Sequence, residues 1–221
     1  MLLCGSSGSA QKKKMIIRFL GGIATLFVAV LVMAGGTSAQ TSPSKEFGVK
    51  IKNFGQMDER FYRGARPKED DYASLKALGI QTILDLQEEP KEYAKAAAEA
   101  AGLRYVNIPI KDKSYPTEEN VAAFLAAVDD PETGVFFAHC AGGRHRTGDM
   151  GALYRFVKYG WGFDQAYREM KNYDFYSSWG HGKQKDFVED YAARYEAARA
   201  ATASASSSNS STVDIGGVLG L

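Results

Sequence analysis

The stretch VFFAHCAGGRHRTG, residues 135–148, decides the fold. Its apolar start, Val135–Ala138, predicts a short central strand that is buried on both faces of a parallel sheet. Small and polar residues follow His139 and Cys140, and from Gly148 to Tyr159 apolar residues recur at helical spacing. We therefore expect a strand, a tight loop and a helix in succession, with Cys140 at the carboxyl end of the strand.

Outward from this stretch, the chain alternates between strand-like and helix-like segments. We predict strands at residues 49–54, 61–66, 82–86 and 105–110, and helices at residues 72–78, 92–101, 117–128, 164–170 and 187–198. This alternation is typical of an α/β fold in which helices flank a mainly parallel central sheet. Ligands of such sheets bind beyond the carboxyl ends of the strands, where the loop after Cys140 is expected.

The amino-terminal segment differs in composition from the rest of the chain. An uncharged apolar run, Phe19–Ala34, is preceded by the basic residues Lys12, Lys13, Lys14 and Arg18 and followed by the small residues Gly35–Ala39. This order predicts a secretory signal cleaved after Ala39, and hence an exported, periplasmic or secreted protein. A membrane anchor is the alternative, because the run is near the shortest length that spans a bilayer.

Composition divides the chain into four expected parts. They are a signal or anchor at residues 1–39, a linker at 40–47, a catalytic domain at 48–200 and a low-complexity tail at 201–221. Residues 201–213 are almost all Ala, Ser, Thr and Asn, so we expect them to be disordered, because they bury too little apolar surface to fold.

Net charge and cysteine content limit the classes of function that the chain can have. Removal of residues 1–39 takes away four positive charges and no negative ones, which changes the formal net charge from +1 to −3. A chain of this balance is not a general nucleic-acid binder, so any attraction for phosphate must be local. Cys4 precedes the predicted cleavage site, which leaves Cys140 without a disulfide partner. Such a thiol is either buried and inert or kept for its reactivity.

The loop after Cys140 has the features of an anion site. Gly142 and Gly143 permit the positive φ angles and close backbone approach of a tight loop. The loop N–H groups and the following helix dipole attract a phosphate dianion, and Arg146 can bind two of its oxygens. The same field stabilises the Cys140 thiolate as a nucleophile, and Thr147 can donate its hydroxyl to the sulfur. No metal or cofactor is expected, because the loop supplies the positive charge.

The segment resembles the signature loop of the protein-tyrosine phosphatase superfamily, which has His-Cys, five residues, Arg and then Ser or Thr. From about Asn53 to Tyr191 the chain is similar to the atypical dual-specificity phosphatases of bacteria, plants and fungi. Their opening segment is matched by Asn53-Phe54-Gly55, Phe61-Tyr62-Arg63 and Arg66-Pro67. The resemblance implies a general acid on a loop before the cysteine, and Asp112 matches it best. An exposed turn aspartate is the alternative.

The resemblance implies hydrolysis of phosphomonoesters through a cysteinyl phosphate. Cys140 is then the nucleophile, Arg146 the phosphate clamp and Asp112 the acid and base, while Thr147 assists the sulfur. The other loop residues are expected to bind substrate, namely Ala141, Gly142, Gly143, Arg144 and His145. Arg144 and His145 face either solvent or substrate. His139 is expected to support the loop by hydrogen bonding.

Residues outside the loop are assigned mainly structural roles. Arg63 and Arg66 are expected to stabilise the opening segment, with contacts at the rim of the site as the alternative. Four aromatic residues near the last helix are expected to pack in the core instead of forming a pocket wall: Tyr173, Phe175, Tyr176 and Trp179.

The expected partner is a phosphorylated substrate, most simply a phosphoprotein. The order Arg144-His145-Arg146 also resembles the loop of atypical enzymes that act on inositol pyrophosphates, and Lys111 and Lys113 precede it in the chain. An inositol polyphosphate or phosphoinositide is therefore the alternative substrate. A rhodanese-like sulfurtransferase and a non-catalytic phosphate-binding module are further alternatives. Membrane contact is expected only if the amino-terminal segment is retained as an anchor.

Overall fold

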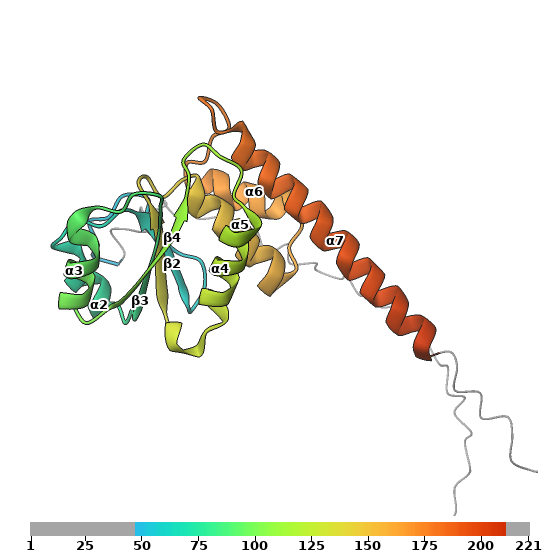
Figure 1. Cartoon of the computed structure of the whole chain (residues 1–221), viewed down its shortest axis with the longest axis horizontal. Helices are drawn as coiled ribbons and strands as arrows, with labels where there is room; N and C mark the ends of the chain where they lie inside the picture. The colour runs from blue at the N-terminus through green and yellow to red at the C-terminus, as the bar shows by residue number, and fades with distance from the viewer. Residues whose placement is uncertain (1–46, 211–221) are drawn as a thin grey trace, which may run out of the picture. The chain divides into compact units, whose positions relative to one another are not determined.

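The computed structural model describes residues 47–210, so the predicted signal or anchor lies outside the described residues. The described residues form a five-stranded sheet between two layers of helices (Figure 1). The strands are β1 Gly55–Gln56, β2 Phe61–Ala65, β3 Thr82–Gln87, β4 Arg104–Ile110 and β5 Phe136–Cys140, in the order β1-β2-β5-β3-β4. Only the β1–β2 pair in this sheet is antiparallel. The predicted α/β fold with a mainly parallel sheet is confirmed.

The helices lie on both faces of the sheet. Their bounds are α2 Asp71–Ala77, α3 Glu92–Ala100, α4 Glu118–Asp129, α5 Arg146–Tyr159, α6 Phe163–Asn172 and α7 Gly182–Ser210, with a short 3₁₀ helix at Pro131–Thr133. Figure 1 shows α2 and α3 on one face and α4 to α7 on the other. Thr117 caps α4 as predicted, because its hydroxyl accepts from the Asn120 N–H while the Asn120 side chain accepts from the Thr117 N–H.

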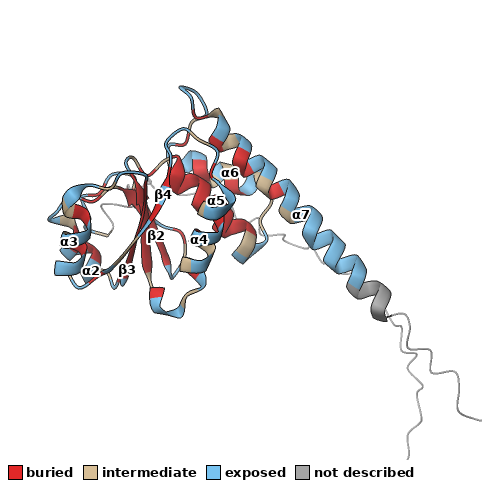
Figure 2. Cartoon of the chain, viewed as in Figure 1, coloured by how far each residue is buried: buried red, intermediate tan, exposed pale blue. Residues whose placement is uncertain are grey.

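Strand β5 is buried throughout, and its side chains divide between two cores. The strands at the centre of the sheet are coloured as buried in Figure 2. Phe136, Ala138 and Cys140 belong to the core under α4 to α7, whereas Phe137 belongs to the core under α2 and α3. This is the alternation that a strand imposes. Phe136 stacks on Phe61 at 4.6 Å between ring centroids. Cys140 therefore faces the layer that contains α5, the helix that follows it in the chain.

The predicted strand at residues 49–54 is wrong. Val49, Ile51 and Phe54 are buried, but the segment forms turns and no ladder, and the antiparallel strand is only Gly55–Gln56. The reason is Asn53, whose φ of 54° interrupts an extended chain. The apolar alternation predicted the buried residues correctly, but it did not predict that the segment lacks strand pairing.

Several helix limits also differ from the prediction. Helix α5 begins at Arg146 instead of Gly148, and α6 begins at Phe163 after Gly162 instead of after Asp164. Helix α7 begins at Gly182, before the apolar run at Phe187, because its first residues are anchored by polar contacts described below.

Helix α7 continues into the part of the tail that we expected to be disordered, and that expectation is wrong as far as Ser210. Alanine has a high helix propensity, and the hydroxyls of Thr202 and Ser204 donate to the backbone carbonyls of Ala198 and Ala200. Residues 196–205 are all exposed, so this extension buries no core.

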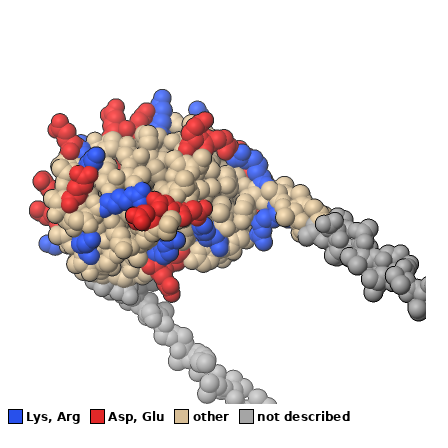
Figure 3. All heavy atoms as spheres, turned by 60° about the horizontal axis from the view of Figure 1, so that its bottom comes forward, with Lys and Arg blue, Asp and Glu red and all other residues tan. Residues whose placement is uncertain are grey.

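The described surface carries charges of both signs. Over the described residues of the face in Figure 3, Lys and Arg are interspersed with Asp and Glu. Within residues 47–210, none of the helices is both long and apolar enough to cross a membrane.

Candidate active site

The loop between β5 and α5 is held against β2 by Gly143. Gly143 has a φ of 68°, and a β-carbon there would collide with the backbone of Gly64 and Ala65. Its carbonyl accepts hydrogen bonds of 2.9 Å from both Arg63 and Asn53. These two hydrogen bonds fix the orientation of the Gly143 peptide within the loop.

Cys140 is a buried free thiol. Burial alone raises its pKa, but the resulting pKa lies below the ordinary value of a thiol. The contributions that lower the pKa come, largest first, from the Thr147 side chain, the charge of Arg146, and the backbone of Thr147 and Gly142, although the Thr147 hydroxyl makes no hydrogen bond of normal geometry within the described residues. The structure therefore brings Cys140, Thr147 and Arg146 together as predicted, in surroundings that favour the thiolate.

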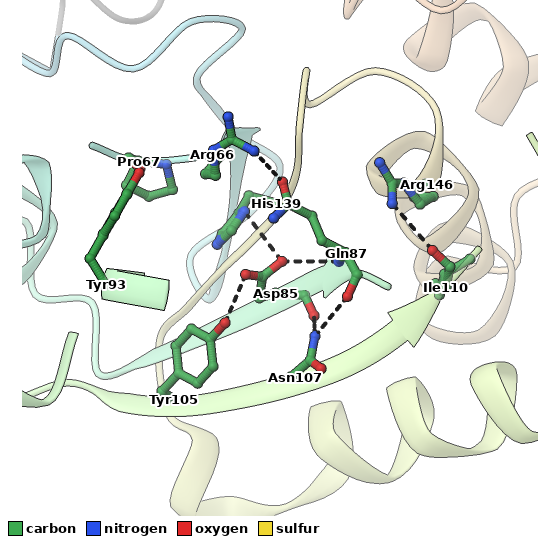
Figure 4. A network of polar contacts seen from close by, with 10 residues as sticks. All are labelled: Arg66, Pro67, Asp85, Gln87, Tyr93, Tyr105, Asn107, Ile110, His139 and Arg146. Atoms are coloured by element: carbon green, nitrogen blue, oxygen red, sulfur yellow. Dashed lines mark hydrogen bonds and ion pairs between the residues drawn. The ribbon is translucent and has the colours of Figure 1, made fainter. Parts of the chain in front are cut away.

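Arg146 connects the loop with Asp112. The Arg146 side chain is only 9% exposed; it donates to the Ile110 carbonyl at 3.2 Å and lies 3.5 Å from Asp112 Oδ1. Figure 4 shows the bond from Arg146 to Ile110 at the end of β4. The Asp112 side chain is 53% exposed. The structure thus places the predicted acid beside the predicted clamp, on a solvent-exposed turn.

The two residues before Arg146 point in different directions. Arg144 is partly exposed, lies 3.6 Å from Asp174 and lines a cleft of about 630 Å³ together with Lys52. The His145 side chain is buried instead: its Nε2 lies 3.1 Å from the Tyr176 carbonyl, and its ring stacks on that of His181. The ring therefore does not face solvent, and substrate binding by His145 stays a prediction that concerns its backbone N–H.

Ala141 and Gly142 line the same cleft as Arg144. Gly143 does not line it, since its backbone is packed against β2. Within residues 47–210, no cluster of three or more His, Cys, Asp or Glu side chains is arranged to hold a metal ion.

His139 supports the loop in a different way from the one predicted. Neither ring nitrogen makes a hydrogen bond of normal geometry to a described residue. The ring is fully buried, with Nδ1 3.7 Å from Asp85 Oδ1 (Figure 4). Burial lowers the pKa of His139, opposed by the charge of Asp85 and the backbone of Cys140. His139 is thus a packed, neutral residue beneath the site.

A polar network at the end of β3 escaped the sequence analysis (Figure 4). Asp85 accepts hydrogen bonds from the Tyr105 hydroxyl and the Gln87 N–H, and Gln87 in turn accepts one from Arg66. Arg66, Gln87 and Arg146 line a second cleft of about 290 Å³. Arg66 therefore reaches the rim of the site, the alternative that we had ranked second. The available signal was the position of Asp85 and Gln87 at the carboxyl end of a central parallel strand.

The remaining predicted residues are divided between core and surface. Arg63 is buried, as expected for a structural role, and lies 4.0 Å from the ring centroid of Tyr173. Phe175 belongs to the core, but Tyr173 lines the cleft beside Arg144, and Trp179 is 84% exposed. Core packing is therefore correct for Phe175 and wrong for Trp179, which lies in a turn at a φ of 58°.

Comparison with known proteins identifies relatives along most of the described region. The family model described as DSP-PTPase phosphatase fused to NAD+ kinase matches residues 44–190. The dual specificity protein phosphatase TpbA of Pseudomonas aeruginosa is 28% identical over 139 residues, which is 62% of each chain. The inositol diphosphatase DSP3 of Arabidopsis thaliana is 27% identical over 111 residues, 48% of this chain and 55% of DSP3. The alignments thus span less than two thirds of these relatives.

A solved structure with the same fold is the core catalytic domain of the PP-IP phosphatase SIW14 from Saccharomyces cerevisiae, determined with citrate. It has a TM-score of 0.55 and 20% sequence identity, and the match covers 63% of this chain and 85% of that one. At this identity the likeness concerns the fold alone.

Proposed function

The chain belongs to the family of DSP-PTPase phosphatases fused to NAD+ kinase, which are atypical cysteine-dependent phosphatases, and from this premise we propose that it hydrolyses phosphomonoesters through a cysteinyl phosphate. One observation carries the proposal. The Cys140 sulfur is buried beside Thr147, Arg146 and the backbone of the loop, which together hold its pKa below the ordinary thiol value despite burial. Such a loop attracts the oxygens of a phosphate and activates the sulfur that attacks it.

In the first step, the Cys140 thiolate attacks phosphorus. The S–P bond forms while the P–O bond to the leaving group breaks, and Asp112 gives its proton to the departing oxygen. Arg146 and the loop N–H groups stabilise the negative charge on the phosphoryl oxygens. The 3.5 Å separation of Asp112 from Arg146 supports this role, because it puts the carboxyl at the mouth of the loop.

In the second step, water attacks the cysteinyl phosphate. Asp112 now accepts a proton from the water, the S–P bond breaks, and inorganic phosphate leaves. The Thr147 hydroxyl stabilises the sulfur as it regains its charge, consistent with the lowering of the Cys140 pKa by the Thr147 side chain. Neither step requires a metal ion, because Arg146 and the loop N–H groups stabilise the negative charge on the phosphoryl group.

The decisive test is turnover of p-nitrophenyl phosphate and a phosphotyrosyl peptide by the Cys140→Ser protein. We expect wild-type activity and a loss of at least about 10⁴-fold in the variant, since the covalent route requires the sulfur. Activity equal to wild type would exclude the mechanism. Unchanged turnover in Asp112→Ala would favour a sulfurtransferase, which needs no general acid.

For the substrate we propose a phosphoprotein, with phosphotyrosine as the main target. TpbA, a dual specificity protein phosphatase by name, is the relative that supports this choice. An inositol polyphosphate or phosphoinositide is the second candidate, favoured by Lys52 and Arg144 in the cleft beside the loop and by the name of DSP3. Initial rates on phosphopeptides, phosphoinositides and inositol phosphates, with Cys140→Ser as control, distinguish the two. A higher kcat/KM for inositol phosphates would replace the phosphoprotein proposal.

We also propose that residues 1–39 direct export, supported by the basic, apolar and small-residue order of that segment. The test is the amino terminus of the protein recovered from expressing cells. We expect it at Gln40, in the exported fraction. An intact protein in the membrane fraction would favour the anchor instead.

A further inference from the structure

Four residues form a closed ring of side-chain and backbone contacts next to the signature loop. His145 stacks on His181 with ring centroids 3.4 Å apart and planes at 6°. His181 Nδ1 lies 2.6 Å from Gln184 Oε1, and Gln184 Nε2 donates to Asp149 Oδ2 at 2.9 Å. The Asp149 N–H donates to the His145 carbonyl at 2.8 Å, which closes the ring.

The hydrogen bonds of the ring define the protonation of both imidazoles. A backbone carbonyl only accepts, so the Tyr176 carbonyl requires a proton on His145 Nε2. Gln184 Oε1 likewise requires a proton on His181 Nδ1. Two stacked imidazolium ions would repel each other in a buried site, so the two rings are not both charged.

Asp149 has no basic side chain at ion-pair distance among the described residues. It is fully buried, and its Oδ1 makes no hydrogen bond within residues 47–210. Burial raises the pKa of Asp149 well above its ordinary value, opposed by the hydrogen bond from Gln184 and by the charges of Arg146 and Arg63. Asp149 serves the ring as a hydrogen-bond acceptor for Gln184.

The ring connects the start of α5 with the start of α7. His145 immediately precedes Arg146, whose side chain is the phosphate clamp, and Asp149 lies in the first turn of the same helix. His181 directly precedes α7, and Gln184 lies in its first turn. The carboxyl-terminal helix thus fixes the turn that aims Arg146, although it contributes nothing to the cleft walls.

We infer that His181 and Gln184 are positioning residues of the active site, which act through His145 and Asp149 to hold the signature loop in its anion-binding geometry. The inference rests on the proposed function, since it names a support for the same loop. It predicts that breaking the ring weakens phosphate binding more than it slows the chemical step, because Cys140 and Asp112 keep their own contacts.

The affinity test compares three variants by the inhibition constant of inorganic phosphate. Gln184→Leu fills the same space but removes both hydrogen bonds, and we expect phosphate to bind about tenfold more weakly, with kcat changed by less than about threefold. Asp149→Asn keeps an acceptor for Gln184, and we expect binding within about twofold of wild type. Val188→Ala is the control: it removes buried volume from α7 outside the ring, and we expect a lower Tm with unchanged phosphate affinity.

A second measurement does not depend on turnover. The chain has three histidines, so long-range ¹⁵N NMR spectra can assign each ring. We expect a proton on His145 Nε2 and on His181 Nδ1, and Gln184→Leu should shift the His145 ring signals. Signals of His145 that Gln184→Leu leaves unmoved would overturn the inference, as would an unchanged phosphate affinity in that variant. If the wild-type protein bound no phosphate while Gln184→Leu still shifted the His145 ring signals, the proposed function would be overturned and the contact between Gln184 and His145 through the ring would stand.

Discussion

The signature loop and the loop that carries Asp112 lie side by side, yet they are held in different ways. The signature loop is tied to β2 by Gly143, its nucleophile Cys140 is buried, and the side chain of its clamp Arg146 is 9% exposed. Asp112 is 53% exposed, and its ion contact with Arg146 at 3.5 Å is longer than a hydrogen bond. The nucleophile and clamp are therefore preorganised, whereas the acid is restrained mainly by an exposed charge pair.

The largest expected effect tests the signature loop, which is the preorganised part of the site. Arg146→Lys keeps the charge but loses the planar fork that binds two oxygens, and we expect kcat/KM to fall by about 10³-fold for any phosphomonoester. Steady-state kinetics with p-nitrophenyl phosphate and a phosphopeptide measure it. Equal losses on both substrates fit a clamp on phosphate, and a loss of less than tenfold would show that charge alone suffices.

The next largest effect tests the exposed loop that carries Asp112. In Asp112→Asn the side chain keeps its size but has no proton to give, so the loss should depend on the leaving group. We expect a decrease of about 10²-fold for a phosphotyrosyl peptide and much less for a substrate with an acidic phenol. Ser114→Ala, in the same turn, is the control and should retain activity. A loss that is independent of the leaving group would contradict the role of Asp112 as an acid.

A smaller effect compares two neighbouring glycines of the signature loop. Gly143→Ala introduces a β-carbon at positive φ and against β2, which costs at least about 1–2 kcal/mol and should weaken phosphate binding tenfold or more. Gly142→Ala is the matched control, because its β-carbon would meet only the Arg144 guanidinium at 3.9 Å. Inhibition by inorganic phosphate measures both. Similar losses in the two variants would show that Gly143 is not a special anchor.

The prediction with the smallest effect on activity concerns the free energy of unfolding at acid pH. Burial, and then the neighbouring His181, lower the pKa of His145 to about 4, with Asp112 and Arg144 as the other charged groups that act on it. The folded pKa lies below the unfolded value of about 6.5, so this contribution is complete above pH 6.5 and is lost as pH falls towards 4. The loss is at most about 3 kcal/mol. Urea unfolding of wild type and His145→Gln from pH 7 to 4 measures it, and parallel curves would exclude it.

Local patterns predicted the parts of the site that lie close together in the chain. The order of strand, loop and helix around Cys140 specifies the positions of Arg146 and Thr147, and the signature resemblance identified Asp112. The contacts of Asn53, Asp85 and His181 were missed, because they join segments that are distant in the sequence. Residue type gave no sign that His145 turns inward, since only the fold brings the α6–α7 connection over its ring.

The central claim is that the loop ionises the sulfur of Cys140 despite its burial. The thiolate absorbance near 240 nm, titrated from pH 4 to 10 as the difference between wild type and Cys140→Ser, tests it most directly. We predict a midpoint below the ordinary thiol pKa of about 8.5, which moves upward in Thr147→Val. A midpoint at or above 8.5 would mean that burial prevails, and the nucleophile assignment would be wrong.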